Sequence, residues 1–232
     1  MEHSHGYDWN GVLLMPSARR KKSFAQTAGS IVEEVRIHIA RHRVRNRVIK
    51  FLRGREFSLI SSNCIGGRLY GLAGEMYLSP TVGLWFMPAD FIEFVGNLSA
   101  YLEKPLQYDA EATLQVGYPV GRLGQLRLFF QHYPSFDFAR AKWVQRSKRV
   151  NLAKVVAIFT DRDGASEQDA VAFDRLLIKR KIMLCARAYQ NVKSAVCVSQ
   201  FKDEMEVGDL YTDWHILDSV LSTKALSSLF SS

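Results

Sequence analysis

The sequence has little cysteine and no long hydrophobic run. Three cysteines occur among 232 residues, and they form no C-x-x-C pair. An odd number without regular spacing argues against a disulfide framework or a structural zinc site and is typical of a reducing compartment. No apolar run reaches the ~18–20 residues of a membrane-spanning helix, and residues 1–20 lack the apolar core of a signal peptide. We therefore expect a cytoplasmic protein, at most peripheral to the inner membrane.

Acidic residues are scarce at the N-terminus, where basic residues are concentrated. Residues 1–56 carry 12 Lys and Arg against 5 Asp and Glu, whereas residues 57–232 carry 19 against 18. The net charge of +8 therefore belongs mainly to the first segment. This distribution indicates a basic arm or helix and not a nucleic-acid-binding domain, so we expect no nucleic acid as a partner.

The composition divides the chain into three parts. Residues 1–29 mix small and polar residues with a basic cluster, which is typical of a poorly ordered tail. Residues 30–54 predict a basic helix, because Ser30 and Glu33 have capping-box spacing and apolar residues recur at helical intervals. This helix is expected either to contact an anionic membrane surface or to be solvated on the body of the protein. Residues 55–232 are expected to form a single α/β domain.

Strand-like and helix-like segments alternate from residue 57 onward. Apolar, extended segments predict strands at 57–62, 125–131, 154–160, 182–186 and 195–199. Helical spacing or capping residues predict helices at 69–73, 88–102, 135–149, 166–177 and 214–230. Residues 106–124 contain three glycines and a proline, which predicts a loop. Strands separated by helices indicate βαβ units, and hence a mainly parallel, Rossmann-like sheet flanked by helices.

Polar clusters follow three of the predicted strands. They comprise Ser61 to Cys64, then Gln131, His132 and Tyr133, then Asp161, Arg162 and Asp163. Ligands of open α/β sheets bind beyond the carboxyl ends of the strands. If the three strands are parallel neighbours, the clusters meet at one edge of the sheet, and we expect them to form a single site.

The segment that follows the first strand is a candidate for phosphate binding. Gly66 and Gly67 let the backbone approach a ligand closely, and N–H groups at a helix start favour an anion. The same glycines are equally typical of a tight strand-to-helix turn. The residues expected to bind substrate or phosphate here are Ser62, Asn63, Gly66, Gly67 and Tyr133.

Cys64 and His132 are the candidate catalytic residues. Cys64 would be a nucleophile if His132 lies beside it, and a histidine suits acid–base chemistry near neutral pH. Each residue also has an ordinary alternative. A cysteine is often a small buried hydrophobic residue, and a histidine in a strand-end loop is often structural.

Two charged pairs are further candidates. Asp161 and Asp163 form a D-x-D pair, which would hold Mg²⁺ or Mn²⁺ bridging the oxygens of a diphosphate. Arg146 and Arg149 lie on one predicted helix and would neutralise phosphate. The alternatives are an acidic turn that hydrogen-bonds its own backbone and a solvated basic helix face.

Several short blocks together resemble a bacterial family of unknown function that is associated with exopolysaccharide or capsule biosynthesis. The blocks are SNCIGG at 62–67, SPTVGL at 79–84, DFIEF at 90–94, YPVGRL at 118–123, HY at 132–133, Trp143 with Arg146, Arg149, Val150 and Asn151, DRDG at 161–164, and Phe173. The resemblance covers roughly residues 55–190. It implies a process, polysaccharide production, and it implies neither a reaction nor catalytic residues.

These observations favour a transferase that acts on an activated sugar or a growing glycan, similar to a glycosyltransferase, with a nucleotide sugar or glycan as its partner. One alternative is a glycan acyl-modifying enzyme that depends on Cys64 or His132. Another is a carbohydrate-binding or assembly factor without catalysis. Metal-dependent nucleotide binding, reactivity confined to Cys64, or glycan binding without turnover would distinguish the three.

Overall fold

The structure is a computed structural model that describes residues 24–231. The described residues fall into two compact units, one that ends at His38 and one that begins at Ile39. Helix α1 (Phe24–Leu52) begins earlier than the sequence predicted. Ser30 lies inside this helix, so the capping box predicted at Ser30 and Glu33 is wrong and residues 24–29 are helical. The first 23 residues of the predicted tail lie outside the described residues.

A parallel sheet of four strands forms the centre of the second unit. Its order is β1-β5-β6-β7, and every neighbouring pair is parallel; the strands are β1 (Ser58–Ser61), β5 (Val155–Thr160), β6 (Lys181–Cys185) and β7 (Ala195–Cys197). The first three strands are almost continuously buried, as expected for strands covered on both faces. The prediction of a mixed α/β fold with a parallel sheet is therefore confirmed.

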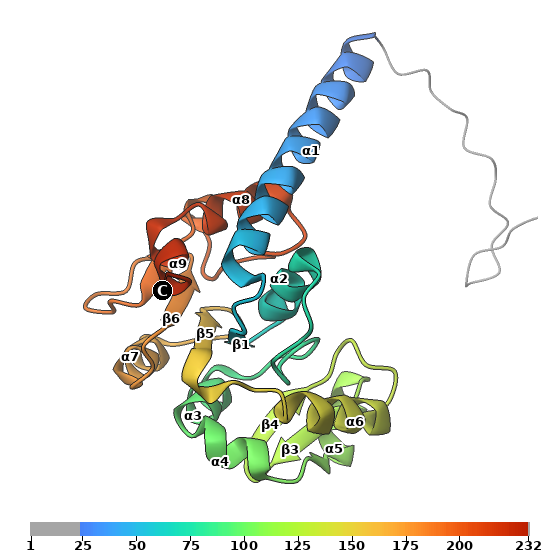
Figure 1. Ribbon diagram of the computed structural model, residues 1–232, viewed down its shortest axis with the longest axis vertical. Coiled ribbons are helices and arrows are strands. Elements are labelled where there is room, and N and C mark those ends of the chain that lie inside the picture. Colours follow the sequence, from blue (N-terminus) through green and yellow to red (C-terminus); the bar gives the residue numbers. More distant parts are fainter. Residues whose placement is uncertain (1–23, 232) are drawn as a thin grey trace, which may run out of the picture. The chain divides into compact units, whose positions relative to one another are not determined.

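Helices cover both faces of this sheet (Figure 1). One core cluster joins the sheet to the end of α1 and to α2 (Ile65–Ala73), α8 (Trp214–Leu221) and α9 (Lys224–Leu229). The cluster on the other face includes residues of α3 (Pro88–Gly96), α4 (Leu98–Glu103), α6 (Phe136–Ser147) and α7 (Glu167–Arg175). The single helix predicted at 214–230 is two helices, because Thr223 caps a new helix by accepting the Leu226 N–H.

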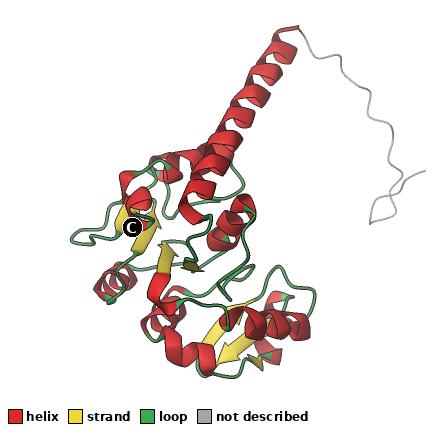
Figure 2. Cartoon of the chain, viewed as in Figure 1, coloured by secondary structure: helices red, strands yellow, loops and turns green. Residues whose placement is uncertain are grey.

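A second sheet is antiparallel, and the sequence did not predict it. Its order is β2-β3-β4, with β2 (Gln107–Tyr108), β3 (Val120–Leu123) and β4 (Leu126–Phe129), and α5 (Ala110–Val116) lies between the first two strands in sequence. Figure 2 shows its strands apart from those of the parallel sheet. The loop predicted at 106–124 is therefore wrong, and so is the parallel placement of the strand at 125–131. A two-residue hairpin loop, with Gly124 at φ 64°, turns β3 directly into β4.

The backbone at residues 84–86 connects the two sheets. Trp85 exchanges two backbone hydrogen bonds with Phe129 of β4, at 3.0 and 2.9 Å. The next residue, Phe86, donates its N–H to the carbonyl of Ser62, just beyond β1, at 3.0 Å. The end of β4 is thereby held close to the carboxyl end of the parallel sheet.

Two short 3-10 helices, Leu152–Lys154 and Ser199–Phe201, complete the described elements. Within residues 24–231, no helix is long and apolar enough to cross a membrane.

Candidate functional site

A polar pocket of about 240 Å³ lies beyond the carboxyl ends of β1 and β5. We call it the strand-end pocket; it is lined by Asn63, Cys64, Trp85, Tyr118, Gln131, Arg162, Asp163 and Tyr211. Residues directly after β1 and β5 contribute half of this set. Its position is the one in which open α/β sheets bind their ligands.

Asn63 is fixed between the sheet and the first turn of α2. Its Nδ2 donates to the Thr160 hydroxyl at 3.0 Å, and its Oδ1 accepts the Ile65 N–H at 3.2 Å. Because both ends of the amide are engaged and the residue is buried, Asn63 holds the ends of β1 and β5 together. It presents the adjacent Cys64 to the pocket.

The Cys64 thiol is half-buried and protonated near neutral pH. Burial raises its pKa to about 11, with the positive charge of Arg162 opposing this effect and the negative charge of Asp209 adding to it. A thiol needs its deprotonated form to act as a nucleophile. The site as built therefore does not activate this cysteine.

Arg162 and Asp163 bring both signs of charge to the pocket. The Arg162 Nη1 donates to the Gly208 carbonyl at 3.4 Å, which links the end of β5 to the segment that carries Tyr211. Asp163 adopts a left-handed conformation with φ 63°. Loss of water around its carboxyl raises its pKa; the Arg162 charge opposes this shift and Glu206 adds to it. A carboxyl group with a raised pKa beside a guanidinium suits acid–base work next to a phosphate.

Asp161, the other member of the predicted metal pair, is buried and hydrogen-bonded to the backbone. Its two carboxylate oxygens accept the N–H groups of Ala186 and Val207, each at 2.8 Å. Burial is the largest influence on its pKa and raises it, and the two N–H donors oppose that shift. Across residues 24–231, no three His, Cys, Asp or Glu side chains are grouped to hold a metal ion.

His132 and Tyr133 follow β4 in the antiparallel sheet, and neither is among the described residues that line the pocket. His132 is exposed, and its N–H donates to the Gly83 carbonyl at 3.4 Å. Its neighbour Gln131 does line the pocket. His132 therefore lies beside the pocket and not in its lining. The backbone hydrogen bonds of residues 84–86 hold the end of β4, and with it His132, near the parallel sheet.

Tyr133 and Arg146 contact each other and the segment that precedes this bridge. The Tyr133 hydroxyl donates to the Val82 carbonyl at 2.5 Å and accepts a hydrogen bond from Arg146 Nη1 at 2.6 Å. The Arg146 guanidinium also lies over the Tyr77 ring, 4.8 Å from its centroid. Arg149, half-buried, follows the end of α6. These contacts give Tyr133 and Arg146 a clear role in holding the 77–83 segment.

The glycines at the start of α2 pack closely against neighbouring segments. A Cβ on Gly66 would lie 2.6 Å from the Ser61 Oγ, and one on Gly67 would lie 3.0 Å from Val82. The Gly66 N–H already donates to the Ser61 hydroxyl at 3.2 Å. The nearby Ser62 hydroxyl is buried and has no hydrogen-bond partner among the described residues.

Sequence reasoning missed three pocket residues as site candidates: Trp85, Tyr118 and Tyr211. Trp85 stacks on Phe129 with ring centroids 4.0 Å apart, and its Nε1 donates to the Tyr118 hydroxyl at 3.2 Å. Gln131 and Arg162 belong to the polar clusters predicted after two strands, although neither was assigned a separate role. Tyr211 had no such signal, because only the fold brings it to the end of β5.

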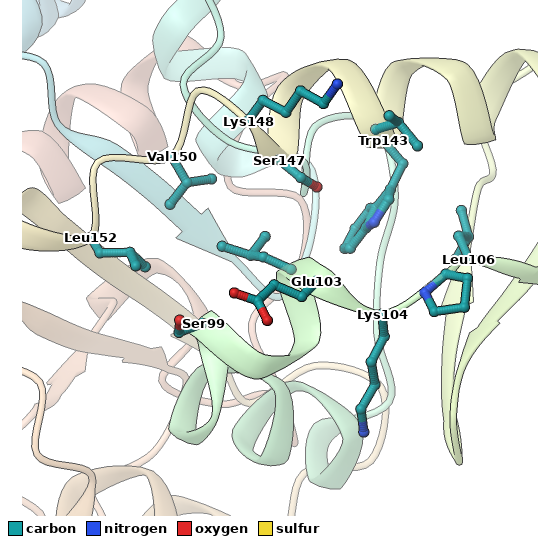
Figure 3. Close-up of a pocket in the computed structure, with 12 residues that line it drawn as sticks. Ser99, Glu103, Lys104, Leu106, Trp143, Ser147, Lys148, Val150 and Leu152 are labelled. Carbon is teal, nitrogen blue, oxygen red and sulfur yellow. The ribbon is translucent and has the colours of Figure 1, made fainter.

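A second pocket, of about 470 Å³, lies between α4 and α6 (Figure 3). Much of its wall is apolar, including Leu102, Leu106 and Val150. Figure 3 shows the Ser147 hydroxyl turned toward the Trp143 indole, and neither polar atom has a hydrogen-bond partner among the described residues. The strand-end pocket brings together a thiol, a carboxylate, a guanidinium and two amides, which are groups that can bind or react with a substrate. We therefore assign the candidate function to the strand-end pocket.

Comparisons with known proteins cover most of this architecture. A family model described as a domain of unknown function (DUF1919) matches residues 35–224, a range that includes every residue of the strand-end pocket. An uncharacterized protein of Haemophilus influenzae is 34% identical over 154 residues, which are 66% of this chain and 73% of the relative. The family match thus spans the parallel sheet, the antiparallel sheet and the pocket between them.

Proposed function

The chain belongs to the DUF1919 family, and from that premise we propose that it is a transferase that binds an activated sugar in the strand-end pocket. The observation that carries this proposal is the combination of Arg162 and Asp163 with the aromatic rings of Trp85, Tyr118 and Tyr211 in one polar pocket. The proposed process is exopolysaccharide or capsule biosynthesis, as the resemblance of the sequence blocks implies. The proposed location is the cytoplasm, a reducing compartment compatible with three free thiols.

The pocket residues have complementary roles in this proposal. Arg162 would neutralise the phosphate of the activated sugar, because a guanidinium stays charged and donates several hydrogen bonds. The aromatic rings would pack on the apolar faces of the sugar, and Gln131 would hydrogen-bond its hydroxyl groups. One face of Trp85 is already covered by Phe129, so a single face remains for a ligand.

Asp163 is the proposed general base. Its raised pKa brings it closer to working pH than an ordinary aspartate. It would accept the proton of an acceptor hydroxyl as that oxygen forms a bond to the sugar, while the bond from the sugar to its phosphate breaks. The ligand would bind beyond the carboxyl ends of β1 and β5, as ligands do in Rossmann-like sheets.

Binding of nucleoside diphosphate sugars tests the proposal. A ligand at 100 times its Kd should stabilise the wild-type protein by about 2.7 kcal/mol in thermal or chemical unfolding. Arg162→Gln should weaken binding about tenfold or more, since a charge-assisted hydrogen bond contributes about 1.5–3 kcal/mol. Arg140→Gln, on the exposed surface of α6, is the matched control and should bind as the wild type does.

Two results would overturn the transferase proposal. Equal weakening in Arg162→Gln and Arg140→Gln would mean that the effect comes from net charge and not from the pocket. Tight binding of a glycan without release of a nucleotide, in the presence of acceptor sugars, would instead favour the non-catalytic carbohydrate-binding factor.

A further inference from the structure

Cys185 and Cys197 lie directly opposite each other on neighbouring strands. Cys185 ends β6, Cys197 ends β7, and the parallel register pairs them residue to residue. Their sulfur atoms are 3.8 Å apart. Neither residue belongs to the strand-end pocket, so the pair lies outside the site of the proposed transferase function.

The backbone around this pair suits a disulfide bond. Paired residues on adjacent strands are ~4.8 Å apart, within the ~4.4–6.8 Å that separates the Cα atoms of bonded cysteines. The sulfurs must approach to about 2.05 Å, a shift of roughly 1.8 Å. Because β7 is a three-residue strand at the edge of the sheet and pairs with β6 alone among the described strands, only one short ladder of hydrogen bonds opposes this shift.

The two thiols differ in exposure. Cys197 is exposed to solvent, whereas Cys185 is fully buried. Burial raises the pKa of the Cys185 thiol, and the neighbouring Cys197 adds to that shift, so Cys185 stays protonated near neutral pH. A dissolved oxidant therefore meets Cys197 first, and Cys185 is placed to react with the product.

We propose that Cys185 and Cys197 are a reversible dithiol–disulfide site that responds to hydroperoxides. In the first step the Cys197 sulfur attacks one oxygen of hydrogen peroxide, the O–O bond breaks, and sulfenic acid and water form. In the second step the Cys185 thiol gives its proton to the sulfenic oxygen on Cys197 as its sulfur attacks the Cys197 sulfur; the S–O bond breaks and water leaves. Two thiols are oxidised, one hydrogen peroxide is reduced, and two waters are released.

The cross-link would fix two neighbouring backbone contacts. Val198, directly after Cys197, donates its N–H to the Cys185 carbonyl at 2.8 Å. Ala186, directly after Cys185, donates its N–H to Asp161. The disulfide thus covalently joins the edge strand to a strand end that is already anchored by the Asp161 carboxylate.

Alkylation and mass spectrometry of the full chain test the proposal. The reduced protein is treated with equimolar hydrogen peroxide and then with N-ethylmaleimide in denaturant. The untreated protein should take up three labels, one for each cysteine. The oxidised protein should take up a single label at Cys64, lose two hydrogens, and give a peptide that joins Cys185 to Cys197. Dithiothreitol should restore all three labels.

Variants and contrary results make the test specific. Cys64→Ala should form the same disulfide, whereas Cys197→Ser, a change at an exposed position, should keep Cys185 fully available for labelling after peroxide. A linkage through Cys64 would overturn the proposal. Stable sulfenic or sulfinic acid at Cys197 with a free Cys185 would do so too, as would an unchanged three-label protein at 100-fold excess of peroxide.

Discussion

The carboxylate of Asp161 accepts the main-chain N–H of Val207 at 2.8 Å, across 46 residues of sequence. The other carboxylate oxygen accepts the N–H of Ala186 at the same distance. One side chain therefore joins the end of β5, the end of β6 and the segment that leads to Tyr211. Asp163, two residues further on, makes no comparable contact with these backbone groups and lines the pocket.

The two aspartates should respond differently to substitution. Asp161→Ala leaves two buried N–H groups without acceptors, and each costs about 1–3 kcal/mol, so we expect a loss of stability of at least about 2 kcal/mol. Asp163→Asn should leave stability unchanged or raise it by less than about 0.5 kcal/mol, because the residue is largely exposed, the raised pKa means that its ionisation does not favour the fold, and Asn tolerates a left-handed backbone. Urea unfolding midpoints at unchanged slope measure both values. Equal losses in the two variants would contradict this assignment.

Metal dependence provides a test of Asp163 as a ligand. If Asp163 holds Mg²⁺ or Mn²⁺ together with substrate phosphate, the wild type should be stabilised further by Mn²⁺ in the presence of a nucleoside diphosphate sugar. Asp163→Asn should lose the Mn²⁺-dependent part. Thermal unfolding with and without each ligand is the measurement, and Asp137→Asn on the exposed start of α6 is the control. Identical Mn²⁺ effects in wild type and Asp163→Asn would exclude Asp163 as a metal ligand.

The reactivity of Cys64 distinguishes the acyl-modifying alternative. Burial raises the pKa of this thiol to about 11 from an ordinary value of 9.0, so its deprotonated fraction at pH 8 is about 100-fold smaller than that of a free thiol. In the Cys197→Ser background, iodoacetamide should react with Cys64 correspondingly slowly, about tenfold faster for each pH unit up to pH 10. A rate that reaches its maximum below pH 8 would show an activated thiol and favour a Cys64 nucleophile.

Stability at acidic pH should depend on Asp109. The Ala112 N–H at the start of α5 and the Arg127 guanidinium, 3.0 Å away, hold the pKa of Asp109 below its usual value despite burial. Because the pKa of Asp109 is lower in the folded protein than in the unfolded chain, its ionised carboxylate stabilises the fold. This stabilisation is complete above the pKa of Asp in the unfolded chain, about 3.9, and is lost as the pH falls through the pKa of Asp109 in the folded protein. Asp109→Asn should therefore cost about 1 kcal/mol at pH 7 and less at pH 3.

The matched control for Asp109 is Asp137→Asn, which removes an exposed carboxylate from its ion pair with Arg140. Exposed pairs contribute little, so its effect should be within about 0.5 kcal/mol at both pH values. Urea unfolding of the three proteins at pH 7 and pH 3 gives the comparison. A cost for Asp109→Asn that grows toward acidic pH would contradict the assigned direction of the pKa shift.

Membrane contact through α1 stays a prediction, and two arginines are suited to its test. Arg41 lies over the Trp214 ring and Arg47 pairs with Asp218, whereas Arg43 and Arg45 are exposed. Each charge near an anionic membrane contributes about 1 kcal/mol, so changing Arg43 and Arg45 to Gln together should weaken vesicle binding about 30-fold at low salt. Co-sedimentation with phosphatidylserine vesicles measures it.

The control for the membrane prediction removes two charges elsewhere, at Arg140 and Lys148 of the α6 region. An equal loss of vesicle binding in this control would show an effect of net charge alone. Unchanged binding after removal of both Arg43 and Arg45 would exclude these two side chains as the membrane contact.

The sequence predicted the elements whose signals are local. Apolar runs located β1, β5, β6 and β7, and the caps at Ser135 and Ser166 were placed correctly because each side chain accepts an N–H three residues ahead. The segment at 106–124 was predicted as a loop because it contains three glycines and a proline. In the structure it holds two short strands and a two-turn helix, whose local signals are weak. Its strands form by pairing with each other and with β4, which no local pattern reveals.

The candidate site was partly predictable, because some of its residues also carry a local signal. Asn63, Cys64 and Asp163 follow strands of the parallel sheet, so the rule about strand ends located them correctly at the pocket. His132 follows a strand of the other sheet, and its distance from the pocket is set by the backbone bridge at residues 84–86. Trp85 and Tyr211 reach the pocket through long-range packing, which a single sequence does not show.

The placement of β1 has a consequence for the order of folding. Its register pairs Ser58 with Val155, about 100 residues later in the chain, whereas β5, β6 and β7 follow one another closely. Pairing between distant segments slows folding, although the entropic cost of closing such a loop grows only slowly with its length. The three later strands should therefore assemble first, with the free edge of β5 open until β1 arrives. During that interval β5 is available to strands of other chains, so aggregation on refolding should rise with protein concentration.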